Sequence, residues 1–219
     1  TVGFICDVSD RAAMQDLAKR IQSKFGTAPS LVLNNAGIHG GADALSGGEI
    51  WHRTLAVNLF GVLNGVQAFV PAMIESGQPG IVINTGSKQG ITQPPGNTAY
   101  NVSKSGVKAL TEGLAHSLRE QTGGRVTAHL LIPGYTHTGM TGGGEKPAAA
   151  WSPEQLADFM LDSLSKGDFY ILCPDNDVTR AMDEKRMAWH MGDLIENRPA
   201  LSRWHPDYKD AFAAFMAKD

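Results

Sequence analysis

The chain has 219 residues, of which 42% are hydrophobic and 19% charged, and its formal net charge is −3. These values predict one globular domain, 1–219, and the scattered charges and interrupted apolar runs argue against a nucleic-acid surface and a membrane span. We therefore expect a cytoplasmic protein with no nucleic acid or membrane partner and no secretory signal. The two cysteines, far apart in the sequence, favour reduced thiols, and no metal-binding motif occurs, so no metal site is expected.

Apolar runs typical of buried strands alternate with segments of helical periodicity along the chain. Strands are predicted at 1–7, 31–37, 80–87, 125–134 and 169–174, and helices at 9–26, 48–76, 97–121 and 152–165, followed by a helical tail at 176–219. This alternation predicts an α/β fold in which helices cover both faces of a doubly wound parallel sheet.

Two of the predicted helices carry informative patterns. In the first, Ser9 is the expected N-cap and Gly26 the stop signal. Its apolar face is predicted to comprise Met14, Leu17, Ala18, Ile21 and Phe25. The apolar residues of the helix at 48–76 cover more than one stripe, which indicates burial on two sides.

Small and polar residues follow the predicted strands, at the edge of a parallel sheet where ligands bind. These strand ends are Asp7, NNAG at 34–37, NTGSKQG at 84–90 and PGYTHTG at 133–139. Their composition predicts a ligand-binding cleft.

A phenol and an ammonium group share one face of the helix at 97–121, because Tyr100 and Lys104 are one turn apart. A free phenol has a pKa of about 10, and lowering it to about 7 requires roughly 4 kcal/mol of differential stabilisation. A neighbouring ammonium favours the phenolate. The pair therefore predicts a proton donor and acceptor that works near neutral pH.

The motif NNAG at 34–37, Ser87 and the motif YNVSK at 100–104, in this order, resemble the short-chain dehydrogenase/reductase family. The resemblance extends from residue 1 to about Cys173. It implies a Rossmann-like sheet and an NAD(P)-dependent oxidoreductase that interconverts a secondary alcohol and a ketone, both small molecules.

The resemblance also implies four catalytic roles. Tyr100 would exchange a proton with the substrate oxygen, and Lys104 would lower the phenol pKa and bind the nicotinamide ribose. Ser87 would bind the substrate oxygen, and Asn58 would hold a water molecule in the proton relay. Taken alone, Asn58 fits a structural residue at a helix kink better, but the full set of four favours the catalytic role. For Ser87, a turn or cap is the lesser alternative.

The same resemblance implies a set of residues that bind NAD or NADP: Asp7, Val8, Asn34, Ala36, Gly37, Tyr100, Lys104, Pro133, Gly134, Thr136 and Thr138. Two of them have structural alternatives. Asp7 also suits a helix start, and Asn34 is as well suited to tying neighbouring strands together.

The family's glycine-rich phosphate turn is not found before Asp7, so the first β-α-β units are expected to be missing from this sequence, on the order of 50 residues. We expect an incomplete record of a longer chain, and the alternative is a truncated relative. Either way the edge of the strand that begins at Leu31 is expected to be exposed. The choice between NAD and NADP cannot be read here, and TGMTGGGE at 138–145 is interpreted as part of a flexible lid at 135–150.

Several residues near the strand ends are candidates for the substrate pocket, although each fits an ordinary loop residue better: His39, Lys88, Gln89, Pro94, Pro95, Tyr135, His137 and Met140. Lys88, beside Ser87, could attract an acidic substrate, but it is interpreted as a solvated lysine. Met182, Met187, Trp189 and Met191 are interpreted as core or subunit contact rather than a substrate entrance.

A homodimer or homotetramer is expected to form through the helices at 48–76 and 98–121. Two rival hypotheses remain. One is a non-catalytic binding or scaffold protein on the same fold, and the other is a nucleotide-sensing regulator.

Overall fold

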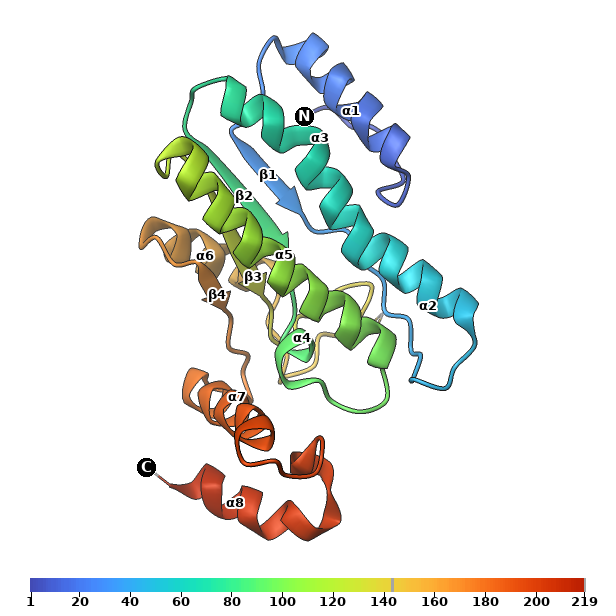
Figure 1. Ribbon diagram of the computed structural model, residues 1–219, viewed down its shortest axis with the longest axis vertical. Coiled ribbons are helices and arrows are strands. Elements are labelled where there is room, and N and C mark those ends of the chain that lie inside the picture. The colour runs from blue at the N-terminus through green and yellow to red at the C-terminus, as the bar shows by residue number, and fades with distance from the viewer. Residues whose placement is uncertain (143, 219) are drawn as a thin grey trace.

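The computed structural model describes residues 1–142 and 144–218. Its centre is a parallel sheet of four strands in the order β1-β2-β3-β4 (Figure 1). The strands are β1 (Leu31–Asn34), β2 (Gly80–Thr85), β3 (Val126–Ile132) and β4 (Tyr170–Leu172). The predicted α/β fold with a parallel sheet is therefore confirmed.

The segment before Asp7 is not the predicted buried strand. Residues 1–6 pair with none of the described strands, and Val2 and Ile5 are exposed. The segment instead lies along α1, where the Arg20 guanidinium sits over the Phe4 ring at 4.9 Å. An apolar run becomes a buried strand only where a neighbouring strand accepts its hydrogen bonds, and the described residues offer none here.

Helix α1 (Arg11–Phe25) begins one residue later than predicted. Its N-cap is Asp10, whose Oδ1 accepts hydrogen bonds from the backbone N–H groups of Ala12 and Ala13 at 2.8 and 3.1 Å. Ser9 is therefore not the cap, since it donates from both its N–H and its hydroxyl to the Asp7 carboxylate. The helix ends at Gly26 as predicted, with φ +71°, a conformation that glycine adopts without strain.

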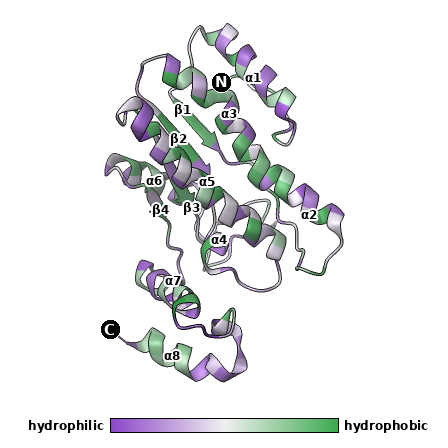
Figure 2. Ribbon diagram, viewed as in Figure 1, coloured by the Kyte–Doolittle hydropathy of each residue, from purple (hydrophilic) through white to green (hydrophobic). Residues whose placement is uncertain are grey.

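The predicted apolar face of α1 is correct except at its end. Met14 is buried, and Leu17, Ala18 and Ile21 pack against the same core, whereas Phe25 is exposed. Figure 2 shows α1 alternating between hydrophilic and hydrophobic residues, as expected for a helix with one covered face.

One long helix is formed by α2 (Gly48–Leu55), a π-helical segment at Ala56–Phe60, and α3 (Gly61–Glu75). By length and composition alone, this helix could cross a membrane. Half of its most apolar window is buried inside the protein, however, and buried core helices pass the same test.

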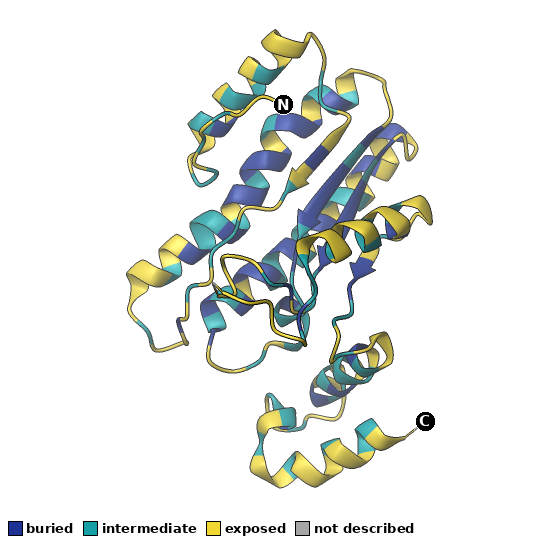
Figure 3. Cartoon of the chain, turned by 180° about the vertical axis from the view of Figure 1, so that it is seen from behind, coloured by how far each residue is buried: buried dark blue, intermediate teal, exposed yellow. Residues whose placement is uncertain are grey.

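Helices cover both faces of the sheet, as predicted. On one face, Val32, Val82 and Ala128 pack against α1, α3 and α5 (Thr98–Thr122). On the other, Ile83 and Leu131 pack against α6 (Pro153–Ser165), which begins at Ser152 with a capping box. Adjacent residues such as Val82 and Ile83 point to opposite faces, which gives the buried strands of Figure 3 two covered sides. At the edge formed by β1, which was expected to be exposed, Leu31 and Leu33 are exposed.

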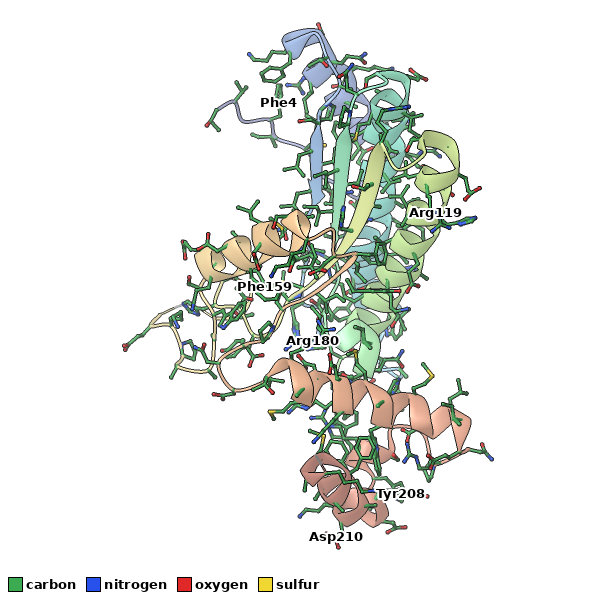
Figure 4. The ribbon with its side chains drawn as sticks, turned by 90° about the vertical axis from the view of Figure 1, so that its left-hand side faces the viewer. Phe4, Arg119, Phe159, Arg180, Tyr208 and Asp210 are labelled. Atoms are coloured by element: carbon green, nitrogen blue, oxygen red, sulfur yellow. The ribbon has the colours of Figure 1, made fainter. Side chains whose placement is uncertain are left out.

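Two short 3-10 turns, Ser202–Trp204 and Pro206–Tyr208, join α7 (Arg180–Ile195) to α8 (Lys209–Ala217). The short helix α4 (Gln89–Thr92) lies beside α7. Figure 4 shows the pair beyond the carboxyl ends of the strands, with Arg180 on the side of the sheet. Trp189 is buried against Phe212 and Phe215, so it is a core residue, while Met191 is exposed.

Candidate active site

The carboxyl ends of the strands and the start of α5 bring the predicted catalytic residues together. Ser87 follows the end of β2 by two residues, and Tyr100 and Lys104 lie in the first two turns of α5. The Ser87 hydroxyl lies close enough to the Tyr100 phenol to lower its pKa. Lys104 Nζ lies 5.7 Å from the centroid of the Tyr100 ring. The shared helix face predicted for the last two residues is thus present.

Burial dominates the electrostatics of Tyr100. Burial raises the pKa of Tyr100 above its ordinary value, and the neighbouring Ser87 hydroxyl acts in the opposite direction but is the smaller effect. In the chain without a nucleotide, the cost of removing a phenolate from water outweighs the favourable contacts, so the phenol pKa is raised. The lowering expected with a cationic nicotinamide beside Lys104 stays a prediction.

Lys104 is a buried cation, with 4% of its surface exposed. Burial lowers its pKa from 10.5 to about 8. Its Nζ donates to the Thr85 carbonyl at 2.8 Å, which ties α5 to the end of β2. An ammonium group has three N–H donors, and among the described residues this carbonyl is its only hydrogen-bond partner, so donors remain for a ligand.

Asn58 lies in the π-helical segment and is fully buried. Its Oδ1 accepts from the Ile38 N–H at 2.7 Å, and its Nδ2 donates to the Ile38 carbonyl at 2.9 Å and to the Ser103 hydroxyl at 3.2 Å. The side chain therefore fixes the loop after NNAG to α5. This supports the structural interpretation, and the water-holding role stays a prediction.

Gly37 lies where the catalytic residues meet. A β-carbon at this position would come within 3.4 Å of Asn58 Oδ1 and 3.8 Å of both Lys104 Nζ and Met140 Cε. The absence of a side chain thus leaves room beside the Lys104 ammonium. It also shows that the loop around Met140 reaches the NNAG loop.

Asn34 links strand β1 to β2, which agrees with one of its two predicted roles. Its Nδ2 donates to Asn84 Oδ1 at 2.8 Å, and Asn84 Nδ2 donates to the Thr111 hydroxyl at 3.0 Å. The amide also packs closely against Gly65 of α3. With these contacts, Asn34 joins β1 to β2 and both to the covering helices.

The segment after β3 is held in place by close backbone contacts. A β-carbon at Gly134 would lie 2.8 Å from the Pro174 carbonyl, so only glycine fits without displacement. Thr136 is buried and forms a parallel bridge with Trp151, whereas Thr138 is exposed and its hydroxyl accepts from the Met140 N–H at 3.3 Å. Pro133, at the start of this segment, is half-buried. The predicted contacts of these residues with a nicotinamide stay predictions, and the predicted lid includes Gly143, which lies outside the described residues.

The residues predicted near the adenine end are set apart from the catalytic group. Asp7 is exposed, and hydrogen bonds from Ser9 lower the pKa of its carboxyl group. The Val8 side chain packs against Gly61, and its carbonyl accepts from Asn64 Nδ2 at 2.9 Å. Ala36 is exposed at the end of β1. The helix-start interpretation of Asp7 is consistent with this turn.

Lys88 corrects another prediction. It is not solvated: its side chain is 18% exposed and lies 2.6 Å from Asp183 Oδ2 and 3.5 Å from Asp175 Oδ2. The sequence carries little signal for this contact, since both carboxylates lie in the part of the chain after β4.

His39, a predicted pocket candidate, lies beside Tyr100, whereas Ser103 is a side chain that the sequence did not place in the site. The His39 ring centroid lies 5.3 Å from that of Tyr100, and His39 Nε2 is 2.9 Å from Asn97 Nδ2. The spacing of Ser103, beside Lys104 on the same helix, could have suggested its contact with Asn58.

Metal-ligating side chains do not gather in the described part of the chain, where no group of three His, Cys, Asp or Glu residues is placed to hold an ion. Both cysteines are free thiols. Cys6 is half-buried, and burial raises the pKa of Cys173 to about 12.

Comparison with known proteins identifies the family. The family model described as short chain dehydrogenase matches residues 1–148. The chain belongs to the short-chain dehydrogenase family. Among its relatives is the 3-oxoacyl-(acyl-carrier-protein) reductase of Thermotoga maritima, 36% identical over 169 residues, which cover 76% of this chain and 63% of the relative. The chain thus spans less than two thirds of that protein's length.

Two further short-chain dehydrogenases extend the comparison. The 1-deoxy-11-beta-hydroxypentalenate dehydrogenase of Streptomyces avermitilis is 30% identical over 198 residues, which cover 84% of this chain and 70% of the relative. A crystal structure of a short-chain dehydrogenase/reductase from Burkholderia phymatum in complex with NAD matches with a TM-score of 0.79 at 28% identity, covering 90% of this chain and 77% of that one. The predicted family and fold are therefore confirmed.

Proposed function

We propose that this short-chain dehydrogenase is an NAD(P)-dependent oxidoreductase that interconverts a secondary alcohol and a ketone. The observation that carries the proposal is the placement of the buried Lys104 ammonium 5.7 Å from the Tyr100 ring, with the Ser87 hydroxyl close to the same phenol. These three side chains come from two segments, the loop after β2 and the start of α5. Their convergence supplies a proton donor, a hydrogen-bond donor and a positive charge in one place.

Tyr100 is the general acid and base in this proposal. When an alcohol is oxidised, its hydroxyl proton passes to the phenolate oxygen of Tyr100, while a hydride leaves the carbon that bears the hydroxyl group. In the reverse direction, Tyr100 returns the proton to the oxygen of the ketone as the hydride arrives. The Ser87 hydroxyl donates a hydrogen bond to that oxygen and stabilises its developing negative charge.

Lys104 favours the phenolate form of Tyr100 through its charge. Because its pKa is about 8, it is mostly protonated at neutral pH despite its burial. Its remaining N–H donors suit the hydroxyl groups of a ribose beside Gly37, and this fit supports a nicotinamide nucleotide at the site. We further propose that Asn58 holds a water molecule beside Lys104.

A bound nicotinamide supplies the hydride acceptor or donor. The residues proposed to hold the nucleotide are Asp7, Val8, Ala36, Gly37, Tyr100, Lys104, Pro133, Gly134, Thr136 and Thr138. Asn34 acts through the strands in this proposal. The solved relative from Burkholderia phymatum contains NAD, and the choice between NAD and NADP is left to experiment.

The proposed substrate class rests on what the relatives have in common. One is named as a reductase of an oxoacyl group and the other as a dehydrogenase of a hydroxy compound. The two substrates differ in size and shape, whereas both names describe chemistry at a hydroxyl or oxo group. We propose a cytoplasmic homodimer or homotetramer, and exposed apolar side chains on the two long helices, Ile50, Phe60 and Val102, support the assembly.

The proposal is tested with the 219-residue chain and its Tyr100→Phe variant. Titration with NADH and NADPH, followed by nicotinamide fluorescence, measures binding, and a panel of ketones and secondary alcohols measures turnover. The variant is expected to bind the nucleotide as the parent does and to lose turnover by about 10²-fold or more. Tyr208→Phe, in the distant 3-10 turn before α8, is the matched control and is expected to retain turnover.

Each other outcome favours a named rival. Retained turnover in Tyr100→Phe contradicts the proposed mechanism. Nucleotide binding without turnover of any alcohol or carbonyl compound favours a nucleotide-sensing regulator. A parent chain that binds neither nucleotide favours the non-catalytic scaffold.

A further inference from the structure

A buried group of three charges lies next to Ser87. The Lys88 ammonium is 2.6 Å from Asp183 Oδ2 and 3.5 Å from Asp175 Oδ2, and the carboxylates are 7% and 6% exposed. Such a group is costly to bury, since each charge loses its hydration. We call Lys88, Asp175 and Asp183 the buried triad.

Asp175 holds two segments at once. Its Oδ1 accepts from the Val178 N–H at 2.7 Å, which fixes the turn after β4. Its Oδ2 accepts from the Tyr135 N–H at 3.0 Å, in the segment that follows β3. Lys88 therefore contacts a carboxylate that also fixes the start of the predicted lid.

Asp183 brings in the C-terminal helices. It lies in the first turn of α7, whose N-cap is Thr179, and a negative charge is favourable at that end of a helix. Burial raises the pKa of Asp183, and Lys88 is the largest influence in the opposite direction. The positive charge of Lys88 thus offsets part of the cost of burying this carboxylate.

The chain around Lys88 leaves Ser87 little freedom. On one side, the Gly86 N–H donates to the Leu131 carbonyl at 2.7 Å. On the other, the Ser87 carbonyl accepts from the Gly90 N–H at 3.0 Å, and the Ser87 hydroxyl accepts from the Gln89 N–H at 3.2 Å. The buried triad supplies the only contact of this loop with α7 that rests on charge among the described residues.

We propose that Lys88 is a positioning residue: by binding Asp183 and Asp175, it holds the Ser87 hydroxyl against the Tyr100 phenol and couples Ser87 to the segment at Tyr135. The inference rests on the proposed roles of Ser87 and Tyr100. A role in stability alone would not need these charges, because apolar side chains of similar volume stabilise a buried site as well or better.

The test measures the Tyr100 phenol directly, without cofactor or substrate. The chain has four tyrosines, so labelling tyrosine with carbon-13 at Cζ gives four resonances, and Tyr100→Phe identifies the one from Tyr100. The Cζ chemical shift responds to hydrogen bonding of the phenol oxygen. Ser87→Ala defines the shift of Tyr100 without its Ser87 partner.

The decisive variant is Lys88→Met with Asp183→Asn, which removes one charge of each sign. We expect its Tyr100 resonance to move toward the Ser87→Ala position. The same two substitutions added to Ser87→Ala are expected to leave the resonance where Ser87→Ala places it. Lys166→Met with Asp162→Asn, an exposed pair on α6, is the matched control and is expected to have no effect.

Two results would overturn the inference. One is a Tyr100 resonance that does not move in the folded Lys88→Met/Asp183→Asn variant. The other is a Tyr100 resonance that moves equally far when these two substitutions are added to Ser87→Ala, because the effect would then not depend on Ser87. If the double variant does not fold, Asp183→Asn alone is judged in the same way, with a smaller displacement expected.

Kinetics give a second readout if the parent turns over a substrate. Loss of one hydrogen bond at the reacting oxygen is expected to lower kcat about tenfold, with KM nearly unchanged. Lys88→Arg keeps the charge and is expected to restore both values. A rise in KM alone, or no rescue by arginine, would contradict positioning of Ser87. Because the resonance test needs no turnover, failure of this inference is distinguishable from failure of the proposed activity.

Discussion

The Lys104→Met substitution removes a buried positive charge from α5 and leaves a side chain of similar length. Lys104 is the proposed partner of Tyr100, so the variant is expected to lose activity. We expect it to gain stability at neutral pH, because folding the parent requires taking this ammonium out of water. The two effects would show that the site is maintained at the expense of the fold.

The magnitude follows from the pKa of Lys104. A fall from 10.5 in water to about 8 in the folded chain corresponds to a cost of about 3 kcal/mol when the group is protonated. The variant also loses the hydrogen bond to the Thr85 carbonyl, which is worth about 1 kcal/mol. The net gain in the free energy of unfolding is therefore about 2 kcal/mol at pH 7.

The dependence on pH has a definite sign. Between pH 8 and pH 10.5 the unfolded parent holds the Lys104 proton and the folded parent has released it, so the parent becomes more stable as the pH rises. The advantage of the methionine variant is complete below pH 8. It disappears as the pH approaches 10.5.

Urea unfolding of parent and variant at pH 7 and pH 10, followed by circular dichroism, measures both quantities. Lys108→Met is the control, since Lys108 lies on the same helix but is partly exposed beside Glu112. It is expected to change stability little at either pH. A Lys104→Met variant that is less stable than the parent at pH 7 would refute the reasoning. So would a gain in the free energy of unfolding that is the same at pH 7 and pH 10.

Two further predictions concern local structure, and thermal unfolding measures both. Gly65→Ala places a β-carbon against Asn34 Oδ1 and is expected to lower stability by about 1–3 kcal/mol, whereas Gly113→Ala, with open space around it, is expected to raise stability by up to about 1 kcal/mol. Equal effects of Gly65→Ala and Gly113→Ala on stability would contradict the close contact between Gly65 and Asn34. Asp10→Ala is expected to lower the free energy of unfolding by about 1 kcal/mol, because it removes the N-cap of α1. Ser9→Ala is expected to lower it less. A larger loss in Ser9→Ala would indicate that Ser9 is the cap.

The sequence predicted most of the fold because its signals are local. The spacing of Tyr100 and Lys104 places them on one helix face wherever that helix packs, and Gly26 ends α1 through its own conformation. The strand ends gather at one edge because the strands are parallel. These parts of the site depend on few distant residues.

The errors and omissions concern properties that depend on distant parts of the chain. Lys88 reads as an ordinary loop lysine until α7 brings Asp183 against it. The pKa of Tyr100 depends on how completely the phenol is buried, which a list of neighbouring residues does not give. The segment at 1–6 has the composition of a buried strand, and its state is decided by which strands lie beside it.

The π-helical segment at Ala56–Phe60 acts as a phase shift in the long helix. The Gly61 N–H bonds to the Ala56 carbonyl, five residues back, so the turn contains one residue more than an α-helical turn. One extra residue rotates the following faces by about 100°. The helix is therefore continuous, yet α2 packs on α5 whereas α3 packs on α1 and the sheet. Asn58 lies in this π-helical segment. The extra residue therefore sets both the orientation of Asn58 and the face that α3 presents to the core.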